Sequence, residues 1–405
     1  MSDGDKEWRA LLDRLQTATY GERILLSLAA LVLSILVGAL VVLVSGIPAD
    51  CGGATFCYNP IEVYYELFFG AIGGNPLGGD WSPTNFSMAT TLQTATILLF
   101  TGLSVAVAFQ AGMFNIGTQG QLVLGSLATA VAVLYAGPYL PGGLLGTLLL
   151  IPIGVFAGAV IGGVWGAVPG ALKAYADANE VITTIMLNFV ATGISAVLLS
   201  RYFQDETSPN PQTPAIPEYA EIPHVPIVGF EPRIDFSLLA LLFAVVLVGV
   251  VHFVLRQTSF GYDLRTSGKQ PEAAEYGGVD SKRLMVSSMT LSGALGGIGG
   301  SLWVLMVHGR WLRNVPSFGF DGITVSILAG NNPLGVGFAA LLFGVLKSGS
   351  RAIDTATGVP PQLVDVLSGL IILFVAMPEF FRMIGGYYRR AREPTVAADG
   401  GEIDE

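Results

Sequence analysis

Ten apolar runs separated by polar breaks follow one another along this 405-residue sequence, and two of the runs are short. About 20 apolar residues are enough for a helix to cross the hydrocarbon core of a bilayer. Backbone groups cannot go without hydrogen-bond partners in lipid, and the runs are continuous rather than alternating as in barrel strands. The sequence therefore predicts an all-α, polytopic membrane bundle. The ten predicted segments are 24–47, 88–108, 118–136, 143–168, 182–200, 236–255, 284–306, 319–330, 335–349 and 362–381.

The composition is typical of a chain whose residues lie mostly within a lipid bilayer. Only 12% of the residues are charged and 52% are hydrophobic, whereas a soluble domain is about a quarter charged. The net charge is -10, so the basic surface that a nucleic-acid partner requires is absent and none is expected. The first run is longer than the apolar core of a secretory signal, and we expect it to be a retained helix.

The distribution of Lys and Arg predicts how the chain is oriented. With ten spans and a cytoplasmic N-terminus, most of the 20 Lys and Arg residues fall on the cytoplasmic side, as the positive-inside rule requires. We therefore expect a multi-pass protein of the plasma membrane with both termini in the cytoplasm. The expected parts are a cytoplasmic segment 1–23, a transmembrane domain 24–381 and an acidic tail 382–405.

Two long connections are predicted to face outward, at 48–87 and 201–235. The first includes an amphipathic stretch at 61–72 and the only cysteines, Cys51 and Cys57, which form either a disulfide closing a small loop or two free thiols. The second holds seven prolines between positions 209 and 232. A proline-rich stretch is extended and semi-rigid, so it is either a passive linker or a docking surface for an external partner.

Motifs for chemistry are missing from the sequence. No phosphate-binding loop of the G-x-x-x-x-G-K-[ST] type occurs, and the three histidines are scattered. No nucleophile and base stand in a recognisable arrangement. We therefore expect a transport protein without a catalytic site, metal or cofactor, and if ATP drives it, another chain must hydrolyse the ATP.

Glycines recur every four residues in the fourth predicted segment, and a similar spacing occurs in the seventh. This spacing places them near one helix face, where a neighbouring backbone can approach closely. The face is either a moving interface or, more commonly for each glycine, a site of tight static packing. The glycines concerned are Gly154, Gly158, Gly162 and Gly166, and then Gly293, Gly296, Gly297 and Gly300.

Polar residues interrupt the apolar runs at two breaks, 114–121 and 330–335. Irregular backbone at membrane depth is tolerated only where it is buried in protein or lines a cavity, and transporters often place such breaks beside the substrate. Asp321 is an intramembrane ionisable group, although N-terminal capping of the eighth helix explains it better than substrate contact. For Asn115 and Gln119, structural hydrogen bonding and pathway lining are equally favoured. The substrate-pathway candidates are Gln93, Asn115, Thr118, Gln119, Asn188, Asp321, Asn331 and Asn332.

The longest cytoplasmic connection, 256–283, contains a predicted short helix. Pro271 suits the first helical position, good helix formers follow, and Gly277 ends the helix. Such an exposed helix either docks in a groove of another protein or is a solvated connector.

Four motifs taken together resemble ABC importer permeases of the nucleoside and simple-sugar branch, in the branched-chain amino acid and ribose permease superfamily. They are Asn115–Gln121 ("NIGxEGQ"), Asn179–Asn188 ("NEVITTxMLN"), Pro271–Gly277 ("PEAAxYxG") and Phe320–Ile323 with Asn332–Gly335. The order holds from about residue 85 to 381. This chain departs from the pattern at Gln119, where the branch usually has Glu.

The resemblance implies a helical permease fold with two inverted halves, paired with a second, non-identical permease subunit. It also implies cytoplasmic ABC ATPase subunits and an external substrate-binding lipoprotein. The ATPase would be coupled through Pro271, Glu272, Ala273, Ala274 and Gly277. The function implied is import of nucleosides, with simple sugars as the alternative. An ion-coupled transporter, a passive channel and a membrane enzyme are the remaining alternatives.

Overall fold

The computed structural model describes residues 20–47, 57–78, 81–224, 236–360 and 362–373. The predicted N-terminal segment up to residue 19, the tail 382–405 and Cys51 lie outside the described residues. The chain divides into two compact units, one made of 1–60 and 362–405 and the other of 61–361. The two units are described separately.

The smaller unit contributes two apolar helices. Helix α2 (Tyr20–Gly46) contains the first predicted segment, and a helix at Gln362–Leu373 begins the tenth. On α2 the side chains of Ser34 and Val42 are buried, while Leu36 and Leu40 are exposed. Cys57 is disulfide-bonded, and the only other cysteine of the chain is Cys51.

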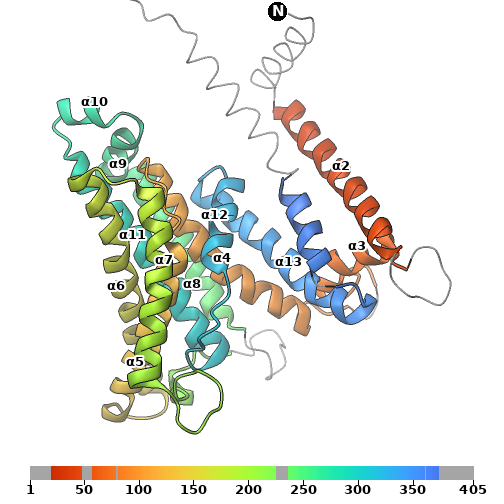
Figure 1. The fold of residues 1–405 in the computed structure, drawn as a ribbon, viewed down its shortest axis with the longest axis horizontal. Coiled ribbons are helices and arrows are strands. Elements are labelled where there is room, and N and C mark those ends of the chain that lie inside the picture. The colour runs from red at the N-terminus through yellow and green to blue at the C-terminus, as the bar shows by residue number, and fades with distance from the viewer. Residues whose placement is uncertain (1–19, 48–56, 79–80, 225–235, 361, 374–405) are drawn as a thin grey trace, which may run out of the picture. The chain divides into compact units, whose positions relative to one another are not determined.

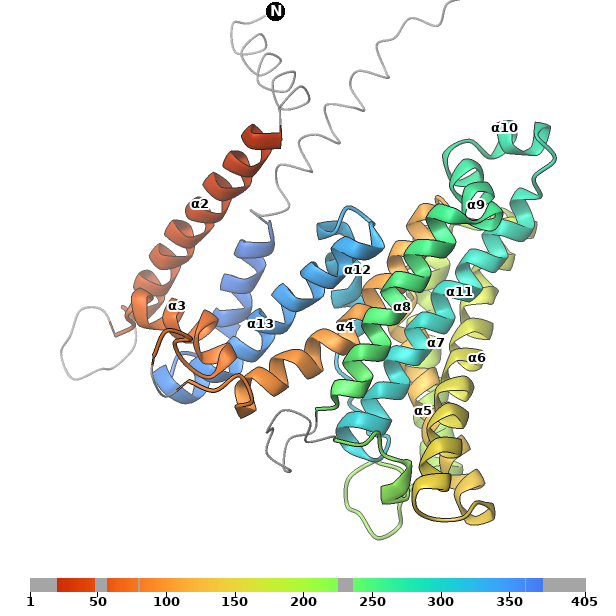
Figure 2. The ribbon, with the colours of Figure 1, turned by 180° about the vertical axis from the view of Figure 1, so that it is seen from behind.

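The larger unit contains a bundle of long helices that lie side by side (Figures 1 and 2). Its long helices are α4 (Phe86–Gln110), α5 (Thr118–Ala136), α6 (Leu144–Ala176), α7 (Glu180–Leu198), α8 (Leu238–Gln257), α11 (Ser281–Leu302) and α13 (Pro333–Thr357). The shorter ones are α3 (Pro60–Phe68), α9 (Ser259–Lys269), α10 (Pro271–Tyr276) and α12 (Phe318–Leu328). Single turns are η1 (Gly70–Ile72), η2 (Gly137–Tyr139), η3 (Leu199–Phe203), η4 (Glu218–Ala220) and η5 (Trp303–His308).

The described residues confirm the all-α prediction. Seven helices are long and apolar enough to cross a membrane, and three shorter apolar helices accompany them at 32–46, 318–328 and 362–373. Each of the ten corresponds to one predicted segment. The described residues hold no strand beyond an isolated bridge between Gln212 and Leu312.

Burial separates the helices of the core from those of the periphery. In α4, 83% of the most apolar window is buried, and in α11 the share is 72%. The corresponding shares are 22% for α6 and α7 and 28% for α8, although α8 is the most apolar of all. Helices α4, α5 and α11 therefore form the centre, and α6, α7 and α8 have broad exposed apolar faces.

Close contact between glycines packs α6 onto α11 and α5. A side chain at Gly162 would collide with the carbonyl oxygen of Gly293, and one at Gly297 with that of Gly158. A methyl carbon added to Gly125 of α5 would lie 2.5 Å from Cα of Gly297. The backbones therefore touch directly, as the glycine spacing predicted.

Asparagine side chains begin two of the helices that carry the recognised motifs. Asn179 accepts hydrogen bonds from the backbone N–H groups of Val181 and Ile182 at the start of α7, at 3.0 and 3.1 Å. Asn332 accepts one from Leu334 at 3.2 Å, and Pro333 occupies the first turn of α13. Both are the N-capping arrangement that supplies acceptors to otherwise unpaired backbone donors.

The proline-rich connection after α7 packs along the segment that follows η5. Backbone hydrogen bonds join Thr213 N–H to the Trp311 carbonyl at 3.0 Å, Ile216 N–H to Gly309 at 2.8 Å and Ile222 N–H to Leu305 at 2.8 Å. Trp311 is fully buried and its indole N–H donates to Ser126 at 2.8 Å. The described part of this connection is therefore anchored to the bundle, at the end opposite α9 and α10 (Figure 1).

Candidate functional site

The first break is shorter than the sequence suggested, because α5 begins at Thr118 and only 111–117 is non-helical before it. Asn115 is fully buried at this break. Its amide nitrogen donates to Ser292 Oγ of α11 at 2.7 Å and to Gln121 Oε1 at 3.0 Å. Ser292 in turn donates to the Ser104 carbonyl of α4 at 2.6 Å. This network ties three core helices together, and buried polar groups with partners of this kind fix a single arrangement.

Thr118 belongs to the same network, since its hydroxyl lies 3.2 Å from Ser104 Oγ, and it is fully buried. Asn188 reaches the break from α7. Its oxygen accepts from the Gly120 N–H at 2.8 Å and its nitrogen donates to the Ile116 carbonyl at 3.0 Å. The Asn188 amide thus supplies one hydrogen-bond acceptor and one donor to backbone groups at the break beside α5.

Gln119 connects α5 to the start of α12. Its side-chain nitrogen donates to the Pro316 carbonyl at 2.9 Å, and its oxygen accepts from the Gly319 N–H at 2.8 Å. A segment without regular structure, 309–317, leads from η5 to this point. Helix α12 is therefore a short helix that begins beside α5, and the first-turn N–H group of Gly319 is satisfied by a neighbouring side chain rather than by water.

The N-cap position of α12 is Ser317, so Asp321 is not the N-cap residue, although it stands at the end of the helix where a carboxylate was expected. Asp321 lies in the first turn, and its carboxylate forms an ion pair of 2.9 Å with the Lys347 ammonium of α13. The Asp321 side chain is 20% exposed and that of Lys347 is 36% exposed. An ion pair at this depth neutralises both charges, which otherwise would be expensive in a membrane.

The second break, 329–332, joins α12 to α13. Gly330 and Asn331 both have positive φ angles, 60° and 56°, and the left-handed conformation is uncommon for Asn. The Asn331 carbonyl accepts from the Gln110 side chain at the end of α4 at 2.9 Å, and its own side-chain oxygen accepts from Ser326 at 2.9 Å. A sharp turn therefore connects the two helices and is tied to α4.

The connection 256–283 contains two helices, α9 and α10, rather than the single one predicted. Ala274 is buried in α10, whereas Glu272 and Ala273 are exposed and Tyr276 is 96% exposed. Gly268 of α9 packs directly on the backbone of Gly112, just after α4, where a side chain would not fit. Helix α10, with its exposed face, therefore directly follows α9, which contacts the end of α4.

Comparison with known proteins identifies the chain. The description "Branched-chain amino acid transport system / permease component" matches residues 87–376. The chain belongs to this family. The permease is 33% identical to the nucleoside ABC transporter permease protein NupB of Lactococcus lactis subsp. cremoris, over 88% of this chain and 91% of that protein. It is 31% identical to the guanosine ABC transporter permease protein NupP of Bacillus subtilis, over 91% and 97% respectively.

A third relative has a different named substrate. The glucose ABC transporter permease protein TsgB13 of Haloferax volcanii is 31% identical to the permease over 85% of this chain and 88% of that protein.

The pathway candidates of the permease do not form one group. Asn115 and Thr118 lie in the buried network of α4, α5 and α11. Gln119 and Asn188 form hydrogen bonds with backbone groups near the start of α5 and α12. Asn331 and Asn332 form hydrogen bonds at the second break. Gln93 is half-buried on α4. Because these amides and hydroxyls already form hydrogen bonds within the subunit, direct contact with a substrate stays a prediction.

Sequence reasoning missed Lys347 as the partner of Asp321. A signal was available: Lys347 is the one lysine inside the ten predicted segments, and a lone intramembrane cation needs a neighbouring anion. Reasoning from the sequence could not match the pair, because α12 and α13 are separated by a turn whose geometry depends on Gly330 and Asn331.

Proposed function

We propose that this permease forms the transmembrane pathway for nucleosides in an ABC-type importer of the plasma membrane. The similarity to two permeases named for nucleoside and guanosine transport, over nearly the whole length of each, carries this proposal. The helical bundle supports it, because it provides membrane-spanning helices, two breaks and an exposed short helix of the predicted kind.

Energy would come from separate cytoplasmic ATPase subunits that bind the exposed face of α10. A continuous chain of contacts supports this role. Gly268 of α9 packs on Gly112, Gln110 ends α4 two residues earlier, and its side chain holds Asn331 at the second break. A displacement of α9 would therefore be transmitted to the turn between α12 and α13. Both termini would lie on this cytoplasmic side.

The mechanism that follows is alternating access. Binding of ATP would favour one arrangement of α9 and α10, and the ATPase must bind the two arrangements with different affinity to shift their populations. The remaining components would be a second, non-identical permease subunit and an external lipoprotein that delivers the substrate to the end formed by 137–143 and 204–224.

Import of simple sugars is the second candidate, and the similarity to a permease named for glucose favours it. An ion-coupled mechanism is less well supported, since it needs a buried carboxylate for the coupling ion and Asp321 is already neutralised by Lys347.

Uptake of radiolabelled nucleoside in cells that carry or lack this chain tests the proposal. Loss of uptake on deletion, with competition by unlabelled adenosine and not by ribose or glucose, is the expected result. Uptake that is unchanged by deletion would remove the nucleoside assignment, and competition by glucose alone would favour the second candidate.

Coupling through α10 is tested separately with the double variant Glu272→Lys and Gly277→Pro. The first change reverses a charge on the exposed face, and the second removes the N–H that Gly277 donates to Ala273 at 3.3 Å. Nucleoside uptake is expected to be lost. Asp354→Lys, an exposed charge reversal near the end of α13 and outside α10, is the matched control and leaves uptake unchanged. Normal uptake in the double variant would show that α10 is not the coupling element.

A further inference from the structure

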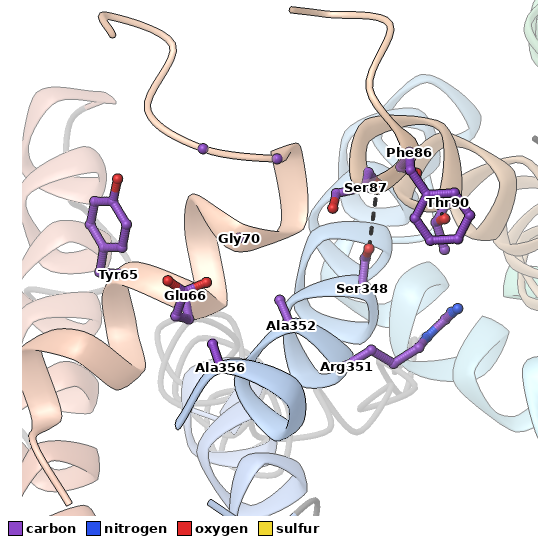
Figure 3. Close-up of a pocket in the computed structure, with 12 residues that line it drawn as sticks. Tyr65, Glu66, Gly70, Phe86, Ser87, Thr90, Ser348, Arg351, Ala352 and Ala356 are labelled. Atoms are coloured by element: carbon purple, nitrogen blue, oxygen red, sulfur yellow. Dashed lines mark hydrogen bonds between the residues drawn. The ribbon is translucent and has the colours of Figure 1, made fainter. Parts of the chain in front are cut away.

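A cavity of about 580 Å³ lies at the end of the larger unit opposite to α9 and α10 (Figure 1), and Figure 3 shows the residues that line it. It is enclosed by α3, the turns that follow it, the first residues of α4 and the last turns of α13. Binding sites for small molecules have volumes of roughly 300–1,000 Å³, so the cavity has the size of a ligand site.

The position of the cavity relates it to transport. Helix α4 has 25 residues, starts at the cavity with Phe86 and ends at Gln110, whose side chain donates to the Asn331 carbonyl at the second break. A helix of this length extends about 37 Å, which is more than the hydrocarbon thickness of a bilayer. With the coupling helices in the cytoplasm, the cavity therefore opens on the outer side.

The walls combine opposite charges with hydroxyl groups. Glu66 projects from α3 and the Arg351 guanidinium from α13, on different walls (Figure 3). Thr90 is 9% exposed and Ser348 is 5% exposed. Ser348 donates a hydrogen bond to the Ser87 carbonyl at 3.5 Å, which joins α13 to α4 beneath the cavity. A carboxylate accepts hydrogen bonds and a guanidinium donates up to five, so a ligand with both donors and acceptors is matched.

Aromatic rings and glycines complete the walls. Phe86 is 67% exposed and Tyr65 is 43% exposed, and each offers a ring face at which a planar base could stack. Gly73 and Gly74 have φ angles of 79° and 120°, a backbone conformation that residues with side chains rarely adopt. Glycines here leave the backbone uncovered on that side of the cavity.

Burial raises the pKa of Glu66, and the charge of Glu62 one turn earlier raises it further. Both causes act in the same way, because lost hydration and a neighbouring like charge disfavour the charged form of the carboxyl group.

We propose that this cavity is a binding site for nucleoside on the outer side of the permease itself, which the substrate occupies before it enters the bundle. This inference rests on the proposed nucleoside function. A neutral solute with ribose hydroxyls, a flat base and both donor and acceptor edges fits Glu66, Arg351 and Phe86 together. The mixed charges suit neither a phosphate group nor the acyl chain of a lipid. Guanosine is the sharpest probe, since its base carries N–H donors for a carboxylate and O6 and N7 acceptors for a guanidinium.

The test uses the complete transporter, with both permease subunits and the ATPase, in nanodiscs without the external binding protein. Binding of radiolabelled guanosine is measured for the native protein and for Glu66→Gln, Arg351→Lys and Phe86→Ala. We expect saturable binding that each variant weakens about tenfold, which corresponds to loss of one charge-assisted or stacking interaction. Phe86 lies at the rim, so its replacement tests the site even if a variant of Arg351 does not fold.

Asp354→Asn is the matched control, because Asp354 lies on α13, as Arg351 does, is exposed and does not line the cavity. It leaves binding unchanged. Guanosine binding that is equally strong in all variants would overturn the cavity site. If intact cells still took up nucleoside, the proposed function would stand. Saturable binding of leucine or glucose in place of guanosine would overturn the nucleoside assignment of the cavity, and absence of nucleoside uptake in intact cells would overturn the proposed function as well.

Discussion

Two groups of helices in the larger unit are held together by different means. Helices α5, α6 and α11 touch through glycines, and their backbones lie so close that a single added carbon would collide with a neighbouring backbone. Helices α12 and α13 are connected by the Asp321–Lys347 ion pair and by a turn in the left-handed conformation at Asn331.

The difference concerns what each group can do. Glycine contacts lose their dispersion energy as soon as the helices separate, and interiors packed in this way transmit displacement without deforming. An ion pair and a side-chain hydrogen bond can be exchanged for other partners during a conformational change. The comparison therefore favours α5, α6 and α11 as a fixed frame and the turn between α12 and α13 as the part that moves.

The largest effect is expected for Gly162→Val. The new side chain would collide with the Gly293 carbonyl oxygen, and its Cβ would lie only 2.8 Å from Cα of Gly297. Overpacking typically costs about 1–3 kcal/mol, and contacts with backbone atoms on a second helix leave little room to relax. Thermal unfolding of the purified transporter in nanodiscs should show loss of folded protein or a large fall in Tm.

Gly249→Val on α8 is the control for this comparison, because a Cβ atom built there has no atom within 4 Å outside the adjacent backbone of its own helix. It introduces the same residue into another apolar helix and should change stability by less than about 0.5 kcal/mol. An equal fall in Tm for both variants would mean that valine itself, rather than close packing at Gly162, causes the loss.

A smaller effect is expected for Asp321→Asn. It leaves the Lys347 ammonium without its anion in a partly buried position, and loss of one partner of a fully buried pair costs about 3–5 kcal/mol. Because Lys347 is about one-third exposed, we expect roughly 2 kcal/mol. The double variant Asp321→Asn and Lys347→Gln removes both charges and should recover more than half of the lost stability.

The surface pair Lys173–Asp177, at 3.1 Å, provides the control, since the Asp177 side chain is 94% exposed. Asp177→Asn should change stability by no more than about 0.5 kcal/mol. If the Asp321 double variant were as unstable as the single one, the ion pair would not be what joins α12 to α13.

Most of the fold could be predicted because membrane helices are specified locally. Each span needs a continuous apolar run, so the run at 236–255 was sufficient to predict α8, and the spacing of Gly158 and Gly162 was sufficient to predict a close helix contact. The ninth run, predicted at 335–349, was likewise sufficient to predict α13, which begins at Pro333 after the N-cap Asn332.

The site was less predictable because its contacts join residues far apart in the chain. Gln119 and Pro316 are neighbours only after 309–317 has returned to α5, and Glu66 and Arg351 share a cavity only after α3 has met the end of α13. Apolar periodicity carries no information about such pairs. The sequence could nominate Gln119 and Asp321 as polar residues at membrane depth, but it could not name their partners.

The smallest effect is expected for Gln119→Glu, a change of one atom at the junction between the two groups of helices. A carboxylate still accepts from the Gly319 N–H, but it cannot donate to the Pro316 carbonyl at 2.9 Å, so two acceptors would face each other. A net loss of about 1 kcal/mol is expected at neutral pH. A protonated carboxyl group regains the donor, so the difference in Tm from the native protein should shrink as the pH falls. Gln257→Glu at the exposed end of α8 should show neither effect. A loss at Gln119 that is independent of pH would mean that the amide donor does not hold α12 in place, and α12 would then belong to the fixed frame through Gly319 and Gly322 instead.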